Sequence, residues 1–181
     1  MLVLASRSPR RIELLRRAGL DPVVDPADID EAPLPGEVPR EYVARVALGK
    51  LAAIAPRHPS STVVAADTTV DAGGTILGQP VDDDDARRML SLLSGMTHEV
   101  HTAVAVATGG ETRSCLVTSR VAFRRLDPDR VDWYVRTGEP QGKAGAYAVQ
   151  GMGVVLVAGV WGSLTNVIGL PVPETLALLA P

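Results

Sequence analysis

Arginines cluster at the start of the first helix that the sequence predicts. Cations are disfavoured at the N-terminus of a helix. The segment 6–11, Ser-Arg-Ser-Pro-Arg-Arg, offers Ser8 as an N-cap and Pro9 at the first helical position. Arg10 and Arg11 then stand beside free N–H groups at the positive end of the helix dipole. A bound anion would resolve this conflict, and a phosphate chain fits the chemistry of arginine well. The alternative is a solvated, mildly unfavourable helix start.

A carboxylate and a lysine are the next candidates for chemistry. Asp67 follows the apolar run 63–66, so we expect it at the carboxyl end of a strand, where it would hold a metal or activate water. A turn aspartate that caps neighbouring N–H groups is the alternative. Lys50 interrupts the apolar stripe of a helix predicted over 39–54. Its ammonium therefore points into a polar pocket or extends to the surface.

Two further segments carry residues that suit a ligand. Glu31 closes an acidic cluster at 28–31, where carboxylate oxygens suit Mg²⁺ or Mn²⁺, although a solvated acidic loop is the alternative. The segment 141–151 places Lys143 and Gln150 among small residues. Glycine lets a backbone approach a ligand closely, and the amide of a glutamine can read a base edge.

The composition is that of an ordinary globular protein. The 181 residues are 46% hydrophobic and only 3% aromatic, with a formal net charge of −3, which argues against a general nucleic-acid or anionic-membrane partner. No apolar run approaches the roughly 20 residues that a membrane span needs. The single cysteine excludes an internal disulfide, and the histidines show no zinc-type spacing backed by cysteine. With no signal peptide after Met1, we expect one cytoplasmic domain over 1–181.

The elements that must position these residues alternate between strand and helix at first and form hairpins in the middle of the chain. We expect strands at 2–5, 22–24, 61–66, 75–77, 100–107, 114–123 and 154–157, and helices at 9–18, 39–54, 82–93, 127–135 and 173–179. This order predicts an α/β fold with a mixed, twisted sheet flanked by helices.

Motifs spread in order along nearly the whole chain resemble the Maf family of nucleoside triphosphate pyrophosphatases. They are SRSPRR from Ser6, DIDE ending at Glu31, Lys50 on its helix, AADTTV around Asp67, LSGMTHEVHTAV from Leu93, KAGAYAVQG from Lys143 and GSLTNVIGLPVPET from Gly162. The resemblance implies two lobes around a central cleft, related to the inosine-triphosphate pyrophosphatase architecture. It also implies hydrolysis between the α- and β-phosphates with a divalent cation, Mg²⁺, Mn²⁺ or Co²⁺.

The resemblance further implies a role for individual residues. Asp67 matches the general base that activates water, and Glu31 would join it in holding the metal. The groups that would contact substrate are Ser6, Arg10, Arg11, Lys50, Thr68, Gln79, Lys143 and Gln150. Among them, Arg11, Thr68 and Gln150 match the subfamily that acts on dTTP and UTP, not the one that acts on 7-methyl-GTP.

Two departures and two alternatives accompany the resemblance. Gln79 stands where many members have a lysine and so carries no charge, and Ala148 replaces a frequent glycine. The family name is tied to inhibition of septum formation, so a nucleotide-binding regulator with incidental hydrolysis is one alternative to an enzyme that cleans nucleotide pools. A 7-methyl-GTP pyrophosphatase is the other. We expect a homodimer, a nucleoside triphosphate as ligand, and no nucleic-acid or membrane partner.

Overall fold

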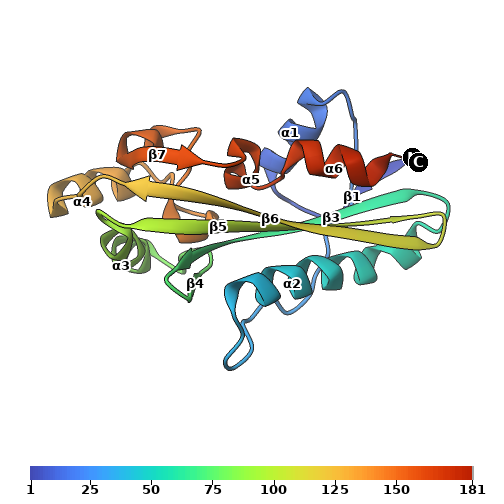
Figure 1. The fold of residues 1–181 in the computed structure, drawn as a ribbon, viewed down its shortest axis with the longest axis horizontal. Helices are drawn as coiled ribbons and strands as arrows, with labels where there is room; N and C mark the ends of the chain where they lie inside the picture. The colour runs from blue at the N-terminus through green and yellow to red at the C-terminus, as the bar shows by residue number, and fades with distance from the viewer. Residues whose placement is uncertain (181) are drawn as a thin grey trace.

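A mixed sheet of seven strands runs the length of the molecule as one twisted layer (Figure 1). The computed structural model describes residues 1–180. The strands are β1 (Leu2–Leu4), β2 (Val23–Val24), β3 (Thr62–Ala72), β4 (Thr75–Leu77), β5 (Thr97–Thr108), β6 (Glu111–Phe123) and β7 (Val157–Trp161), in the order β2-β1-β3-β5-β6-β7, with β4 also paired to β3. β1 is parallel to β2 and β3, and the remaining pairs are antiparallel. The predicted mixed α/β fold is confirmed.

Helices cover both faces of this sheet. They are α1 (Pro9–Arg17), α2 (Pro39–Ile54), α3 (Asp83–Leu93), α4 (Pro128–Arg136), α5 (Leu164–Ile168) and α6 (Val172–Leu179), with short 3₁₀ turns at Ala55–Arg57, Ala144–Ala146 and Met152–Leu156. α2 lies along one face of β3 and β5, and α1, α5 and α6 lie across the other (Figure 1). Within residues 1–180, no helix is both long enough and apolar enough to cross a membrane.

The run 63–66 is apolar throughout because both sides of β3 are covered. Val63 and Ala65 pack with Leu51 and Ile54 of α2, and the alternate residues Val64 and Ala66 pack against α1. Strands buried on both faces read as continuous apolar runs instead of alternating ones. The covering helices thereby fix the side to which each later residue of β3 points.

A second packed cluster forms the other lobe. The far ends of β3, β5 and β6 meet α3, α4 and the segment around Tyr147, with Leu90, Val121 and Tyr134 fully buried between them. In Figure 1 this lobe carries α3, α4, β4 and β7, at the opposite end of the sheet from β1. The expected two-lobed arrangement is present, and the long strands β3, β5 and β6 run through both lobes.

Three details of the sequence prediction are wrong. β3 continues to Ala72 instead of stopping before Asp67, because β5 pairs with it without a break from Val63 to Asp71. The segment 154–157 falls mainly in a 3₁₀ turn, and the strand follows it at Val157–Trp161. The helix α5 was not expected, because its five residues are too few to show a helical period.

Candidate active site

A cleft of about 420 Å³ opens beside the stretch of β3 that lies between its pairing with β1 and its pairing with β4. β1 pairs with β3 as far as Val64, and β4 begins to pair at Val70, so the edge between them faces the cleft. The cleft wall contains every residue proposed from the sequence: Ser6, Arg10, Arg11, Glu31, Lys50, Asp67, Thr68, Gln79, Lys143 and Gln150. Residues from all parts of the chain therefore meet at one place.

Lys50 joins the two carboxylates of this site. Its Nζ donates hydrogen bonds to Oδ1 of Asp67 and to Oε2 of Glu31, both at 2.8 Å. Lys50 and Asp67 are 8% and 6% exposed, so of the two alternatives for this lysine the polar pocket is the one found. Burial raises the pKa of Asp67, and the charges of Lys50 and Arg11 act in the opposite direction.

Asp67 reaches the cleft from the middle of its strand and not from the carboxyl end. The prediction of a strand end was wrong, yet the side chain is accessible to the cleft because β1 stops short of it. Its Oδ1 is used by Lys50, and Glu31 uses Oε2 in the same way. One oxygen of each carboxylate is left over. Hard oxygen donors of this kind fit a Mg²⁺-type cation that takes its other ligands from water and phosphate.

Arg11 is buried and held by acceptors from three parts of the chain. Its Nε donates to the carbonyl oxygen of Gly169 at 2.8 Å, Nη1 to Ser6 Oγ at 3.1 Å and Nη2 to Thr68 Oγ1 at 3.0 Å. Burial lowers the pKa of Arg11, and the nearby charge of Asp67 raises it. The electrostatic conflict at the start of α1 is therefore relieved in part by the protein itself, through a backbone carbonyl and two hydroxyls.

Arg10 and Lys143 bring two further cations to the cleft. Arg10 donates to the carbonyl oxygens of Ile168 at 3.2 Å and Gly142 at 3.4 Å. Burial lowers the pKa of Lys143, and the charge of Arg10 lowers it further. An anion bound between two such cations would relieve their repulsion.

The acceptors that hold the arginines were not foreseen from the sequence. The carbonyl groups belong to Ile168 and Gly169 at the end of α5. The same helix is held by Thr102, whose hydroxyl donates to the carbonyl oxygen of the buried Asn166. The Thr102 hydroxyl also contacts the hydroxyl of Thr68. The only available signal was the motif from Gly162, which contains these residues but gives them no role. Gln79 and Gln150 stand in the cleft wall as exposed side chains.

The fold and the site define an α/β protein with a cation-lined cleft built around a buried carboxylate–lysine pair. A family model described as Maf-like protein matches residues 1–181. The chain belongs to the Maf family.

Several similar proteins carry one name. A protein of Anaeromyxobacter dehalogenans (strain 2CP-1) named dTTP/UTP pyrophosphatase is 55% identical to this chain, and the match covers 98% of this chain and 92% of the relative. A protein of the same name from Myxococcus xanthus is 52% identical, and that match covers 99% of this chain and 91% of the relative. One from Sphingopyxis alaskensis is 51% identical over 99% and 95%. Among solved structures, the Staphylococcus aureus Ham1 protein gives a TM-score of 0.48 at 18% identity, over 67% of this chain and 71% of that one.

Proposed function

We propose that this chain is a nucleoside triphosphate pyrophosphatase that hydrolyses dTTP and UTP to the monophosphate and pyrophosphate. The observation that carries the proposal is the buried contact of Lys50 with Asp67, placed in one cleft with Arg10 and Lys143. A carboxylate that accepts a proton is thereby set beside cations that can neutralise a triphosphate. The names of the similar proteins support the choice of nucleotide.

Asp67 acts as the general base. Burial makes its carboxylate more basic than an exposed aspartate, and the adjacent ammonium of Lys50 favours the ionised form that can accept a proton. The oxygen that does not bind Lys50 takes the proton of a water that attacks the α-phosphorus. The bond from this phosphorus to the bridging oxygen breaks, and pyrophosphate leaves toward Arg10 and Lys143.

A divalent cation completes the site in this proposal. Glu31 would hold it through the oxygen that Lys50 does not use, and Asp67 would hold it through the second lone pair of Oδ1, so that its other oxygen stays free to take the proton. When bound, the ion supplies positive charge to the phosphate oxygens. Lys50 keeps the two carboxylates close together and prevents their charges from facing each other unscreened.

Base selection is assigned to Arg11, Thr68 and Gln150, which line the same cleft. Arg11 orders the Thr68 hydroxyl at 3.0 Å, and the exposed amide of Gln150 lies in the same cleft. An amide offers one donor and one acceptor, which is the pattern needed for the edge of a thymine or uracil ring. A buried guanidinium and an amide so placed favour a pyrimidine with free carbonyl and imide groups.

One nucleotide panel tests the proposal. Purified protein is given dTTP, UTP, dCTP, CTP, dATP, dGTP and 7-methyl-GTP with Mg²⁺, Mn²⁺ or Co²⁺, and pyrophosphate and orthophosphate are measured separately. We expect pyrophosphate and monophosphate from dTTP and UTP, with ¹⁸O from labelled water in the monophosphate. Orthophosphate release would contradict α–β cleavage, and a preference for 7-methyl-GTP would contradict the assignment of Arg11, Thr68 and Gln150.

The proposal includes a homodimer, as the resemblance implies. β7 pairs with β6 only from Arg120 onward, so within residues 1–180 the first part of β6 has β5 as its sole strand neighbour. An open strand edge is a surface on which a second chain can pair. Light scattering during gel filtration measures the mass, and a monomer at micromolar concentration would contradict this part of the proposal.

A further inference from the structure

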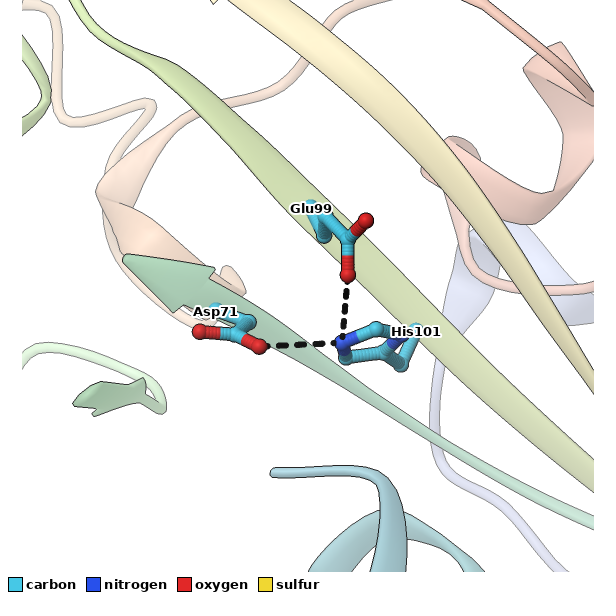
Figure 2. A group of neighbouring side chains, drawn as sticks. All are labelled: Asp71, Glu99 and His101. Carbon is cyan, nitrogen blue, oxygen red and sulfur yellow. Dashed lines mark hydrogen bonds and ion pairs between the residues drawn. The ribbon is translucent and has the colours of Figure 1, made fainter. Parts of the chain in front are cut away.

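Three side chains that could bind a metal ion lie close together on β3 and β5, outside the cleft. They are Asp71, Glu99 and His101 (Figure 2). Asp71 pairs directly with Glu99, and His101 lies two residues along β5, so all three project from the same face of the sheet. Nε2 of His101 is 3.2 Å from Oδ2 of Asp71 and 3.6 Å from Oε2 of Glu99. Asp71 follows Asp67 by four residues, about 13 Å along an extended strand. None of the three belongs to the cleft wall that residues 1–180 form.

The pairing of the two carboxylates requires a positive charge. Like charges directly opposite each other on neighbouring strands destabilise a sheet. Arg120 of β6 stands opposite Glu99, yet in the described part of the chain no lysine or arginine nitrogen lies within 4.0 Å of either carboxylate. A cation bound by all three residues would supply the compensating charge.

Hydrogen bonds already orient the side chains of Asp71 and His101, through the atoms that do not face the other members of the group. The N–H of Gly74 donates to Oδ1 of Asp71 at 2.6 Å, which leaves Oδ2 directed at the histidine. His101 is fully buried, and its Nδ1 is 2.8 Å from the hydroxyl of Thr118. Metal-binding histidines use the second ring nitrogen in this way, which fixes the tautomer and leaves a lone pair on the other nitrogen.

The spacing of the ligand atoms fits a small divalent ion. Bonds of about 2.0–2.1 Å in a tetrahedral arrangement place ligand atoms about 3.4 Å apart. The two measured separations, 3.2 Å and 3.6 Å, lie on either side of this value, and all three atoms lie within 4.8 Å of one another. The side chain of Glu99 is 45% exposed, so water reaches the site and can supply the fourth ligand.

We propose that Asp71, Glu99 and His101 form a second metal site, which takes Zn²⁺ or a similar transition-metal ion. One imidazole and two carboxylates suit such an ion better than Mg²⁺. The site joins β3 to β5 beside the turn of the β3–β4 hairpin, and the chain leaving this hairpin carries Gln79 to the cleft. The bound ion stabilises this part of the fold and takes no part in the hydrolysis.

No zinc site was expected from the sequence, because the histidines lack the spacing to cysteine that marks common zinc motifs. That spacing along the chain does not reveal a site whose ligands meet only through strand pairing. The ligands come from two strands that are distant in the sequence, and cysteine is absent from the set. Only the register that pairs Asp71 with Glu99 brings them together.

Zinc binding is measured by calorimetry on the full chain after treatment with a chelator, in excess Mg²⁺ so that the hard-oxygen site of the cleft is occupied. We expect one Zn²⁺ per chain. Glu99→Gln and Asp71→Asn should weaken binding roughly tenfold or more, since even outer-shell changes cost 10–100-fold. Glu111→Gln removes the same charge from an exposed residue of the neighbouring strand and should leave the affinity unchanged.

Thermal unfolding gives a second measurement that separates a lost ligand from a lost fold. Zn²⁺ should raise the melting temperature of the parent and of Glu111→Gln, but not that of Glu99→Gln. Without metal, Glu99→Gln should melt at or above the parent temperature, because one of two opposed charges is gone. Unchanged zinc affinity in Glu99→Gln would overturn the proposal. So would a parent that binds no Zn²⁺, or a lower melting temperature of metal-free Glu99→Gln, because the latter would show that the Glu99 carboxylate stabilises the fold without a metal.

Discussion

The ammonium of Lys50 lies 2.8 Å from Oδ1 of Asp67, with the two side chains only 10% and 9% exposed. Burial raises the pKa of Asp67, and the adjacent ammonium of Lys50 lowers it. The first effect makes the carboxylate a stronger base, and the second favours its ionised form. The catalytic proposal depends on this balance, and removal of either residue tests it.

Asp67→Asn removes the proton acceptor while keeping the shape of the side chain. We expect the rate of pyrophosphate release to fall roughly 10²–10⁴-fold, as is typical for loss of a general base. Lys50 keeps its hydrogen bond to Glu31, so the fold should remain. A folded variant with the turnover of the parent would contradict the role of Asp67. An inactive variant that still arrests division when overproduced would favour the regulatory alternative.

Lys50 and Asp67 should be coupled in stability. Lys50→Met leaves a buried carboxylate without its partner, and breaking such a pair costs about 3–5 kcal/mol. In Lys50→Met/Asp67→Asn neither charge is left, so the double variant should be more stable than the sum of the single effects predicts, by about 1 kcal/mol or more. Urea unfolding of the four proteins measures the coupling. Strictly additive effects would mean that the contact contributes nothing.

Arg11→Lys tests whether a fixed guanidinium is needed. The three acceptors of Arg11 lie in fixed directions, and one ammonium cannot satisfy all of them. We expect a loss of about 1–3 kcal/mol in stability, since buried acceptors are left without a donor. The ratio of kcat/KM for dTTP to that for dCTP should also fall. Arg17→Lys, on an exposed arginine of the same helix, is the control and should change neither value.

Gln79→Lys restores the charge that many family members have at this position. A charged donor binds a phosphate oxygen more strongly than an amide by about 1 kcal/mol, so KM for dTTP should fall severalfold. The gain should shrink as salt is added, because Gln79 is exposed and its charge would be screened. An unchanged KM at low salt would show that Gln79 does not face the triphosphate.

The parts of the site that sequence reasoning located are those set by local pattern. The helical spacing around Lys50 predicted its inward direction, and Pro9 at the first helical position predicted the start of α1, although the side chain of Ser8 makes no capping hydrogen bond. The length of β3 was missed because polar residues from Asp67 onward end the apolar run, and only pairing with β5 continues the strand. The carbonyl of Gly169 that holds Arg11 is 158 residues away, a contact that no local pattern predicts.

His98 makes the stability of the fold depend on pH. It is 1% exposed among Phe123 and Tyr147, with Nε2 2.9 Å from the tyrosine hydroxyl and Nδ1 buried without a partner among the described residues. Burial lowers the pKa of His98 from 6.5 to about 4. The unfolded chain therefore binds the proton more readily than the folded one. The stabilisation is complete above pH 6.5 and is lost as pH falls toward 4.

Urea unfolding at pH 7.5 and pH 5 measures this contribution. Each unit of pKa shift corresponds to about 1.4 kcal/mol, so the parent should lose about 2 kcal/mol more than His98→Gln between the two pH values. Tyr147→Phe removes the hydroxyl next to His98 but keeps the buried imidazole, so its loss should match that of the parent. Equal losses in the parent and in His98→Gln would mean that His98 is protonated within the fold, and that the aromatic cluster accommodates the charge.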